Sequence, residues 1–149
     1  PIIDYSRQYN KLLNKLYLNL FGIITRSNEY HGISGASWVF IGAGTTAYLF
    51  NEKAAVIALL IMSFSDSAAA IIGIKYGATR LFNKSLEGSM AFFIITYAII
   101  FFLSPASIIL TLIGTISATV IELFSSSRLN DNILIPLGVA LILTLGGIS

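Results

Sequence analysis

The chain has 149 residues, of which 56% are hydrophobic and 11% are charged, and its mean hydropathy is +0.83. Because an ordinary soluble domain carries about 25% charged residues, this composition excludes that class and predicts an integral membrane protein. The lack of cysteine excludes disulfides and thiolate metal sites, and a single histidine, His31, cannot form a histidine metal cluster. With a net charge of +2 and basic residues that bracket apolar stretches, the sequence does not predict a nucleic-acid partner.

A basic amphipathic helix is predicted over Ser6–Ile24. Arg7, Lys11 and Lys15 recur at i, i+4 spacing, and apolar residues fill other positions of the helix: Leu12, Leu13, Leu16, Leu20 and Phe21. Such a helix either lies in the lipid headgroup layer or packs as an ordinary linker helix. We therefore expect an amphipathic segment at residues 1–25 and a transmembrane catalytic bundle at residues 26–149. Because the chain begins without a methionine, an upstream segment is expected to be missing.

Apolar runs in the remainder predict an all-α, polytopic membrane helix bundle of about five transmembrane helices. Each run approaches the roughly 20 residues that a membrane span needs, and none alternates with the period of a strand. The third and fourth runs are separated only by Ser104-Pro105-Ala106, which predicts a tight helical hairpin. The expected spans are Ile33–Phe50, Ala54–Ile74, Met90–Leu103, Ser107–Phe124 and Ile133–Ile148.

Positive charges predict the orientation of these spans. If the amino-terminal segment is cytoplasmic, eight of the nine basic residues fall on the cytoplasmic side and only Lys53 lies outside. The polar loops Lys75–Ser89 and Ser125–Asp131 then share the cytoplasmic side. We expect a site that opens to the cytoplasm, in the endoplasmic reticulum or a prokaryotic plasma membrane.

One carboxylate, Asp66, lies inside the second apolar run. Burying an ionisable group at that depth is costly, so Asp66 is expected to face a polar cavity and to have a function. The second and fourth spans each carry a stripe of small or polar residues on one helical face. The stripes are Ser63, Asp66, Ser67 and Ala70 on the second span, and Thr111, Thr115, Thr119 and Glu122 on the fourth. The alternative is that the hydroxyls join helices and that Ala69, Gly73 and Gly77 are packing positions.

A polar cluster, Lys84-Ser85-Leu86-Glu87-Gly88-Ser89, leads into the third span. The start of a helix attracts anions, and Lys84, the two serine hydroxyls and Gly88 suit a phosphate ligand. Glu87 either stabilises the helix start or holds a metal ion. Asp131 and Asn132, beyond the fourth span, add oxygen donors of the kind that Mg²⁺ takes together with phosphates.

In their order and spacing these residues resemble the CTP-dependent polyprenol and diacylglycerol kinases, a family that includes dolichol kinase and phytol kinase and is related to phosphatidate cytidylyltransferases. The resemblance covers roughly residues 26 to 140. Its motifs are Ser65-Asp66-Ser67-Ala68-Ala69-Ala70, Gly73, Lys75-Tyr76-Gly77, Lys84–Ser89, Glu122 and Leu129-Asn130-Asp131-Asn132 through Pro136, with Arg26, Glu29, Gly35, Trp38 and Gly42 similar to the opening of the diacylglycerol kinase branch.

The resemblance implies transfer of the terminal phosphate of CTP to the hydroxyl of a membrane lipid, with Mg²⁺ or another divalent cation. It implies that Asp66 binds the metal or accepts the proton of the lipid hydroxyl, and that Lys84 acts with it in catalysis. The implied nucleotide-binding residues are Lys84, Ser85, Gly88, Ser89, Asn132 and Arg26, and the implied metal ligands are Asp66, Glu87, Glu122 and Asp131.

Two other functions remain open at the level of sequence. A phosphatidate cytidylyltransferase also uses CTP, a divalent metal and a membrane lipid, but its usual carboxy-terminal signature is not visible here. A small transporter or structural bundle would use Asp66 and Glu122 in an ion path. The sequence does not choose among diacylglycerol, dolichol, another polyprenol and phytol as the acceptor, and it leaves the oligomeric state open.

Overall fold

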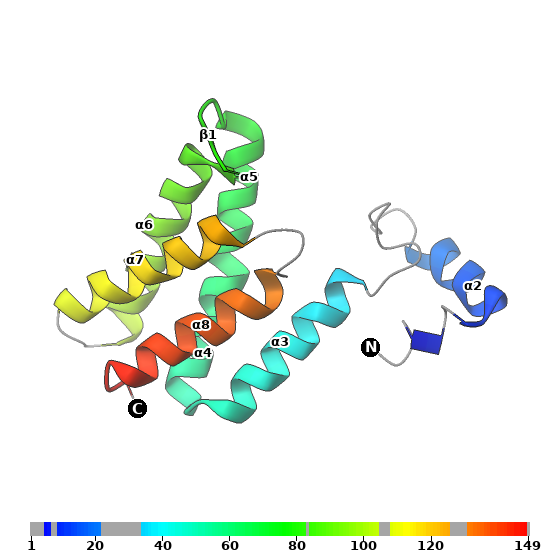
Figure 1. The fold of residues 1–149 in the computed structure, drawn as a ribbon, viewed down its shortest axis with the longest axis horizontal. Coiled ribbons are helices and arrows are strands. Elements are labelled where there is room, and N and C mark those ends of the chain that lie inside the picture. Colours follow the sequence, from blue (N-terminus) through cyan, green and yellow to red (C-terminus); the bar gives the residue numbers. More distant parts are fainter. Residues whose placement is uncertain are drawn as a thin grey trace. The chain divides into compact units, whose positions relative to one another are not determined.

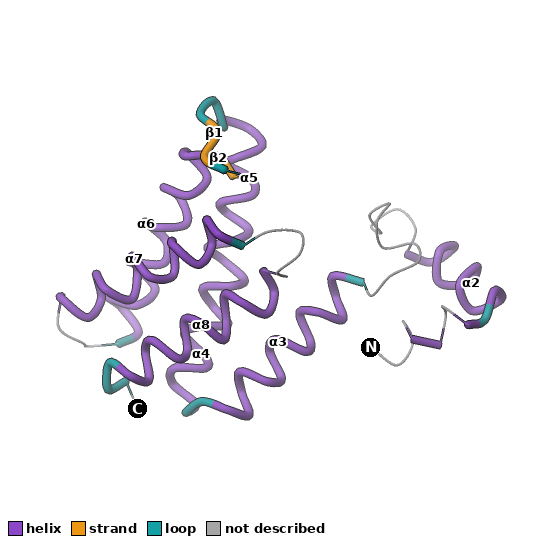
Figure 2. Tube along the Cα trace, viewed as in Figure 1, coloured by secondary structure: helices purple, strands orange, loops and turns teal. Residues whose placement is uncertain are grey.

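The computed structural model describes residues 5–6, 9–21, 34–82, 84–104, 108–125 and 131–148. These residues are helical apart from short loops and one two-stranded hairpin, as Figures 1 and 2 show. The predicted all-α class is confirmed. The chain divides into two compact units, Pro1–Ile41 and Gly42–Ser149. The boundary expected between residues 25 and 26 lies outside the described residues.

In the first unit, helix α2 spans Lys11–Phe21. The side chain of Asn10 begins this helix, since its Oδ1 accepts a hydrogen bond from the backbone N–H of Leu12 at 3.0 Å. Lys11 and Lys15 are exposed, and Leu12 and Leu16 are exposed as well. The helix therefore presents both a basic and an apolar surface, as expected of an amphipathic segment.

Helix α3 spans Gly35–Leu49 and contains the boundary between the two units. The second unit continues with α4 (Glu52–Leu60), the π-helix η2 (Ile61–Ser65) and α5 (Asp66–Tyr76), which follow one another without a break. A hairpin of β1 (Arg80–Leu81) and β2 (Lys84–Ser85) leads into α6 (Leu86–Leu103). Two further helices, α7 (Ile108–Phe124) and α8 (Asp131–Leu145), complete the unit.

The predicted count of five spans is not confirmed. Among the described residues, two helical segments are long and apolar enough to cross a membrane: Glu52–Tyr76 with 25 residues and Leu86–Leu103 with 18. Helices α7 and α8 are apolar but shorter, with 17 and 15 residues. Large apolar side chains such as Ile74 and Phe102 are 88% and 80% exposed, and apolar surface of this kind marks a contact with lipid or with another protein.

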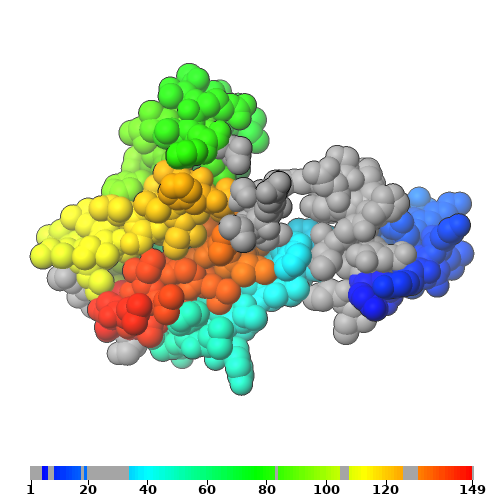
Figure 3. All heavy atoms as spheres, viewed as in Figure 1, coloured from blue at the N-terminus to red at the C-terminus, as the bar shows by residue number. Residues whose placement is uncertain are grey.

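The core of the second unit lies between the long helical segment and helices α6, α7 and α8. Helix α5 packs against α6, α6 against α7, α7 against α8, and α8 against α4, so the contacts form a closed circuit. Helices α7 and α8 lie side by side in the space-filling view of Figure 3. Small buried residues allow the backbones to approach closely around larger ones; the cluster includes Ala54, Ala58, Ala118, Ala140, Ile61, Phe92, Ile100, Ile135 and Leu143.

A proline and a glycine allow α8 to begin close to α3. Pro136 lies inside α8 and has no N–H to donate to the carbonyl of Asn132, four residues earlier. That carbonyl lies against Gly42, where any Cβ would overlap it. A glycine is therefore required at position 42 if α8 is to keep this position.

The π-helix η2 lies directly before Asp66. It widens one turn of the long segment, and Ser65 becomes fully buried. In the core, Thr96 Oγ1 of α6 donates a hydrogen bond to Ser65 Oγ at 3.0 Å. This bond fixes the rotation of the segment against α6 at the residue before Asp66.

Candidate functional site

A cavity of about 490 Å³ lies between α5, the β-hairpin, the start of α6 and the end of α7. Its volume falls in the range of small-molecule binding sites, which is about 300 to 1,000 Å³. Its charged and hydroxyl-bearing lining consists of Asp66, Arg80, Lys84, Ser85, Ser89 and Glu122. The cavity therefore offers charges of both signs to a polar ligand.

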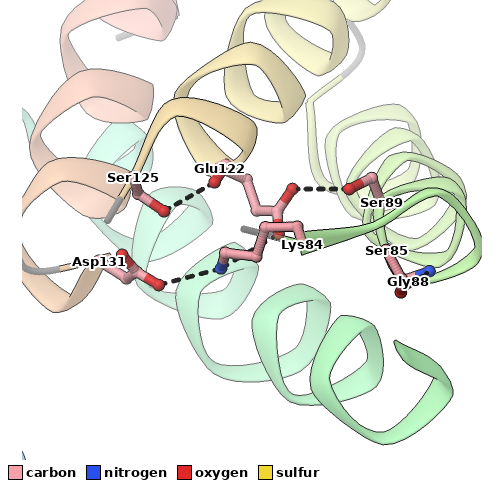
Figure 4. Close-up of polar contacts among 7 residues, drawn as sticks. All are labelled: Lys84, Ser85, Gly88, Ser89, Glu122, Ser125 and Asp131. Atoms are coloured by element: carbon pink, nitrogen blue, oxygen red, sulfur yellow. Dashed lines mark hydrogen bonds and ion pairs between the residues drawn. The ribbon is translucent and has the colours of Figure 1, made fainter. Parts of the chain in front are cut away.

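Lys84 joins two carboxylates beside this cavity (Figure 4). Its Nζ lies 3.0 Å from Asp131 Oδ2 and 3.2 Å from Glu122 Oε1. Ser89 Oγ donates a hydrogen bond to Glu122 Oε2 at 3.1 Å, and Ser125 Oγ donates to the Glu122 carbonyl at 2.7 Å. Because Glu122 is only 1% exposed, the contacts from Lys84 and Ser89 replace the water that its carboxylate loses on burial.

The environment of Lys84 keeps it positively charged. Burial alone would lower the pKa of Lys84, but the hydrogen bond to Asp131 and the charges of Asp131, Glu122 and Asp66 outweigh burial and raise this pKa above its usual value. A raised pKa in the folded state stabilises the fold below the ordinary lysine pKa, and this contribution is lost only as pH rises through the raised value. Lys84 is therefore charged throughout the neutral range.

The hairpin and the start of α6 are held by local hydrogen bonds. Ser85 is the N-cap of α6, and its Oγ accepts the N–H of Gly88 at 3.1 Å. The N–H of Leu86 donates to the Thr79 carbonyl at 2.9 Å, and the N–H of Thr79 donates to the Glu87 carboxylate at 3.1 Å. The predicted metal ligand Glu87 thus faces the hairpin backbone and does not line the cavity.

Two glycines bring α5 and α6 together beneath the cavity. A Cβ on Gly88 would lie 2.7 Å from the Ala69 carbonyl oxygen, and a Cβ on Gly73 would lie 2.7 Å from Ser85 Oγ. The packing interpretation of Ala69 and Gly73 is confirmed by these contacts. Gly88 permits a close approach between two helices, in addition to lining the cavity.

Most of the residues expected at the site meet at this cavity. Asp66, Lys84, Ser85, Gly88, Ser89 and Glu122 all line it. Asp131 does not line it directly and is joined to it through Lys84, while Asn132 is next to Asp131 in the first turn of α8. Arg26 lies outside the described residues.

The expectation that one face of the second span carries Ser63 and Ser67 together with Asp66 is wrong. Both hydroxyls are exposed and donate to their own helix, Ser63 to the Leu59 carbonyl at 2.9 Å and Ser67 to the Ser63 carbonyl at 2.6 Å. They line a separate apolar groove with Phe64. The reason is that the polar cavity spans only the part of α5 around Asp66, whereas Ser67 lies one residue, about 100°, further around the helix.

The hydroxyls of α7 do not point to the cavity either. Thr115 Oγ1 donates to the Thr111 carbonyl at 2.7 Å, and Thr119 Oγ1 donates to the Thr115 carbonyl at 2.9 Å. Threonine commonly satisfies its hydroxyl in this way inside an apolar helix. Of the predicted stripe on α7, only Glu122 lines the cavity.

Sequence reasoning missed one lining residue, Arg80. The hairpin pairs Arg80 with Ser85, so the arginine lies beside the N-cap of α6. Arg80 could have been identified from the sequence as a basic residue four positions before Lys84, in a loop that was expected to hold phosphate. The pairing itself is not visible in the sequence, because this loop carries no strand pattern.

The oxygen atoms around the cavity suit a hard cation that brings further ligands with it. Among the described residues, no three carboxylate, histidine or cysteine side chains are grouped as a ready-made metal site. Asp66 and Glu122 nevertheless supply the one or two carboxylates with which Mg²⁺ is usually held when phosphates and water complete its shell. The donor set therefore fits Mg²⁺ bound together with a phosphate ligand.

Together, two helical segments that are long and apolar enough to cross a membrane and this charged, hydroxyl-rich cavity define a helical protein with a site for a polar ligand. No protein-family model and no solved structure match the chain. The chain is 34% identical to an uncharacterized protein of Rickettsia prowazekii over 152 residues, 96% of this chain and 74% of the relative. It is 37% identical to the CTP-dependent diacylglycerol kinase 1 of Saccharomyces cerevisiae over 95 residues, and 35% identical to the phytol kinase of Synechocystis over 98 residues.

The chain belongs to the family of CTP-dependent diacylglycerol kinases and phytol kinases, as its motif residues predicted. The matches to the yeast kinase and the phytol kinase cover 62% and 59% of this chain. The chain spans about 33% of the length of that diacylglycerol kinase and 42% of that phytol kinase.

The contacts of Lys84 predict a structural role that can be measured. Replacing Lys84 with Met leaves the buried Glu122 without its cation, so the free energy of unfolding should fall by about 2 to 3 kcal/mol. This loss is smaller than that for a fully buried ion pair, because Lys84 is 25% exposed. Thermal unfolding in detergent measures this. Lys53→Met removes an exposed lysine and should be near neutral, and adding Glu122→Gln to Lys84→Met should restore part of the loss. Equal unfolding of Lys84→Met and Lys53→Met would contradict the prediction.

Proposed function

We propose that this protein is a CTP-dependent lipid kinase, which transfers the terminal phosphate of CTP to the hydroxyl of diacylglycerol or a polyprenol. The observation that carries the proposal is the convergence of Asp66, Lys84, Ser89 and Glu122, from four different elements, on one cavity. Membership of the kinase family supports CTP as the donor and a lipid alcohol as the acceptor.

The proposed reaction requires positioning and charge compensation more than covalent catalysis. The lipid oxygen forms a bond to the terminal phosphorus, the bond from that phosphorus to the bridging oxygen breaks, and CDP leaves with the bond electrons. Asp66 accepts the proton of the lipid hydroxyl, or it contributes to holding the divalent cation. That cation, when bound, supplies charge that stabilises the phosphate oxygens.

The remaining residues of the site prepare the cavity for this reaction. Lys84 and Ser89 fix the two oxygens of Glu122 by an ion pair at 3.2 Å and a hydrogen bond at 3.1 Å. Ser85 and Gly88 hold the start of α6 against the cavity. Asp131 and Asn132 complete the shell around the nucleotide from the first turn of α8 in this proposal.

Access of a lipid to the cavity follows from the apolar surface of the helices around it. Ile74 of α5 lines the cavity and is 88% exposed, so the cavity lies next to an exposed apolar surface of α5. A lipid alcohol can then keep its chains in hydrocarbon while its hydroxyl approaches Asp66. We infer that the protein is embedded in a membrane, with α4–α5 and α6 as spans.

CTP labelled on its terminal phosphate tests the proposal directly. Incubation with a panel of diacylglycerol, dolichol, a shorter polyprenol and phytol in mixed micelles should transfer label to at least one lipid. Label in pyrophosphate would instead identify a cytidylyltransferase. Ion uptake into liposomes without CTP consumption would identify a transporter, and either result would overturn the kinase proposal.

The role of Asp66 gives a second prediction. Asp66→Asn keeps the volume of the side chain and removes its charge, so turnover should fall by about 100-fold or more while the unfolding temperature stays close to that of the parent. Glu52→Gln is the matched control, because it removes an exposed carboxylate at the other end of the same helical segment. Normal turnover of Asp66→Asn would remove this residue from the mechanism.

The proposed orientation places the cavity on the cytoplasmic side. Since the chain has no cysteine, single cysteines can report on each side. An impermeant maleimide added outside intact cells should label Lys53→Cys, in the first turn of α4, and should leave Ala78→Cys, between α5 and the hairpin, unlabelled until the membrane is opened. The reverse pattern would invert the topology.

A further inference from the structure

Lys84 and Arg80, the cations among the described residues that line the cavity, differ in how far their charges are compensated within the protein. Lys84 contacts two carboxylates, at 3.0 and 3.2 Å, so most of its charge is already compensated within the protein. Arg80 is exposed, and its guanidinium makes no hydrogen bond or ion pair with any other residue in the part of the chain that the structure describes. Among the described residues that line the cavity, Arg80 is therefore the one whose positive charge is not compensated.

The start of α6 does not replace this charge. Two of its first N–H groups already have partners, since Leu86 donates to the Thr79 carbonyl at 2.9 Å and Gly88 donates to Ser85 Oγ at 3.1 Å. An anion at this helix start would have to displace the Ser85 cap before it could use the N–H of Gly88. The helix dipole still favours an anion, but these two N–H groups are already bonded within the protein.

We propose that Arg80 is the phosphate-binding cation of the cavity and that Lys84 is a positioning residue, which holds Glu122 and Asp131 in place. The inference rests on the proposed function, in which the ligand is a nucleoside triphosphate. A guanidinium binds phosphate through two parallel hydrogen bonds, whereas an ammonium that is shared by two carboxylates has little charge left for a phosphate.

The hairpin gives Arg80 a fixed place from which to act. Arg80 pairs with Ser85 across the two strands, and the pairing attaches it to the N-cap residue of α6. The turn of the hairpin is anchored to α7, because the rings of Phe82 and Phe124 lie 5.5 Å apart between their centroids. Phe82 has a φ of 54°, the left-handed conformation that a tight two-residue turn needs. An arginine on so short a hairpin can move its side chain while its backbone stays fixed.

Arg80→Gln tests the inference by two measurements. Binding of inorganic triphosphate in the presence of Mg²⁺, followed by its protection against thermal unfolding, should weaken about tenfold or more, which is the loss expected for one charge-assisted hydrogen bond or pair. The KM for CTP in the labelled-phosphate assay should rise by a similar factor, and the unfolding temperature without ligand should not change. Arg80→Lys should give an intermediate value.

Lys75→Gln is the matched control, because Lys75 is an exposed cation in the last turn of α5 that does not line the cavity. It should bind triphosphate as the parent does. Triphosphate binding that is equal in Arg80→Gln and Lys75→Gln overturns the inference, and so does a large drop in the unfolding temperature of ligand-free Arg80→Gln.

If the parent transfers phosphate while Arg80→Gln keeps the KM of the parent for CTP, the inference fails and the proposed function stands. If triphosphate binding depends on Arg80 but no lipid is phosphorylated, the proposed function fails and the anion site stands.

Discussion

The ion pairs of Lys84 are the interaction on which the rest of the site depends. Glu122 is buried inside an apolar helix, where a carboxylate without a partner would cost several kcal/mol. Lys84 compensates that charge from the hairpin, Ser89 adds a hydrogen bond from α6, and Asp131 holds Lys84 from α8. One cluster of charges thus joins four elements, and Lys84, Ser89 and Glu122 of this cluster line one side of the cavity.

The opposite wall depends on how the long helical segment is rotated. The π-helix places Ser65 in the core, where it bonds to Thr96, and the next residue, Asp66, then faces the cavity. Close packing of Gly73 and Gly88 brings the start of α6 against the same stretch of α5. A carboxylate in the middle of an apolar segment is tolerated here because the cavity, with the charge of Lys84 nearby, surrounds it with polar groups.

The helices and most of the cavity could be predicted from sequence because their signals are local. Apolar runs indicated where helices lie, and the motif that contains Asp66 and Lys84 indicated the family. The side on which Ser63 and Ser67 lie was predicted wrongly, because i, i+3 and i+4 spacing marks a broad helical face whereas the polar cavity spans only the part of α5 around Asp66. Glu87 was ambiguous because a carboxylate in the first turn of a helix can bind backbone N–H groups or a metal equally well, and only the position of Thr79 decides between them. Arg80 depended on a strand pairing between residues that no periodic pattern marks.

The charges of the site indicate what form of nucleotide it would accept. Of the residues that the structure describes, Asp66, Glu122 and Asp131 contribute three negative charges near the cavity, and Lys84 and Arg80 contribute two positive ones, so this group is slightly negative. A bare triphosphate would add its own negative charges to carboxylates in surroundings where water screens them poorly. A triphosphate that carries a divalent cation avoids this repulsion, because the cation can share oxygen ligands between the phosphates and a carboxylate. The excess of carboxylates over cations therefore favours a metal-bound nucleotide as the ligand, and under the proposed function it explains why acidic residues line a site for an anion.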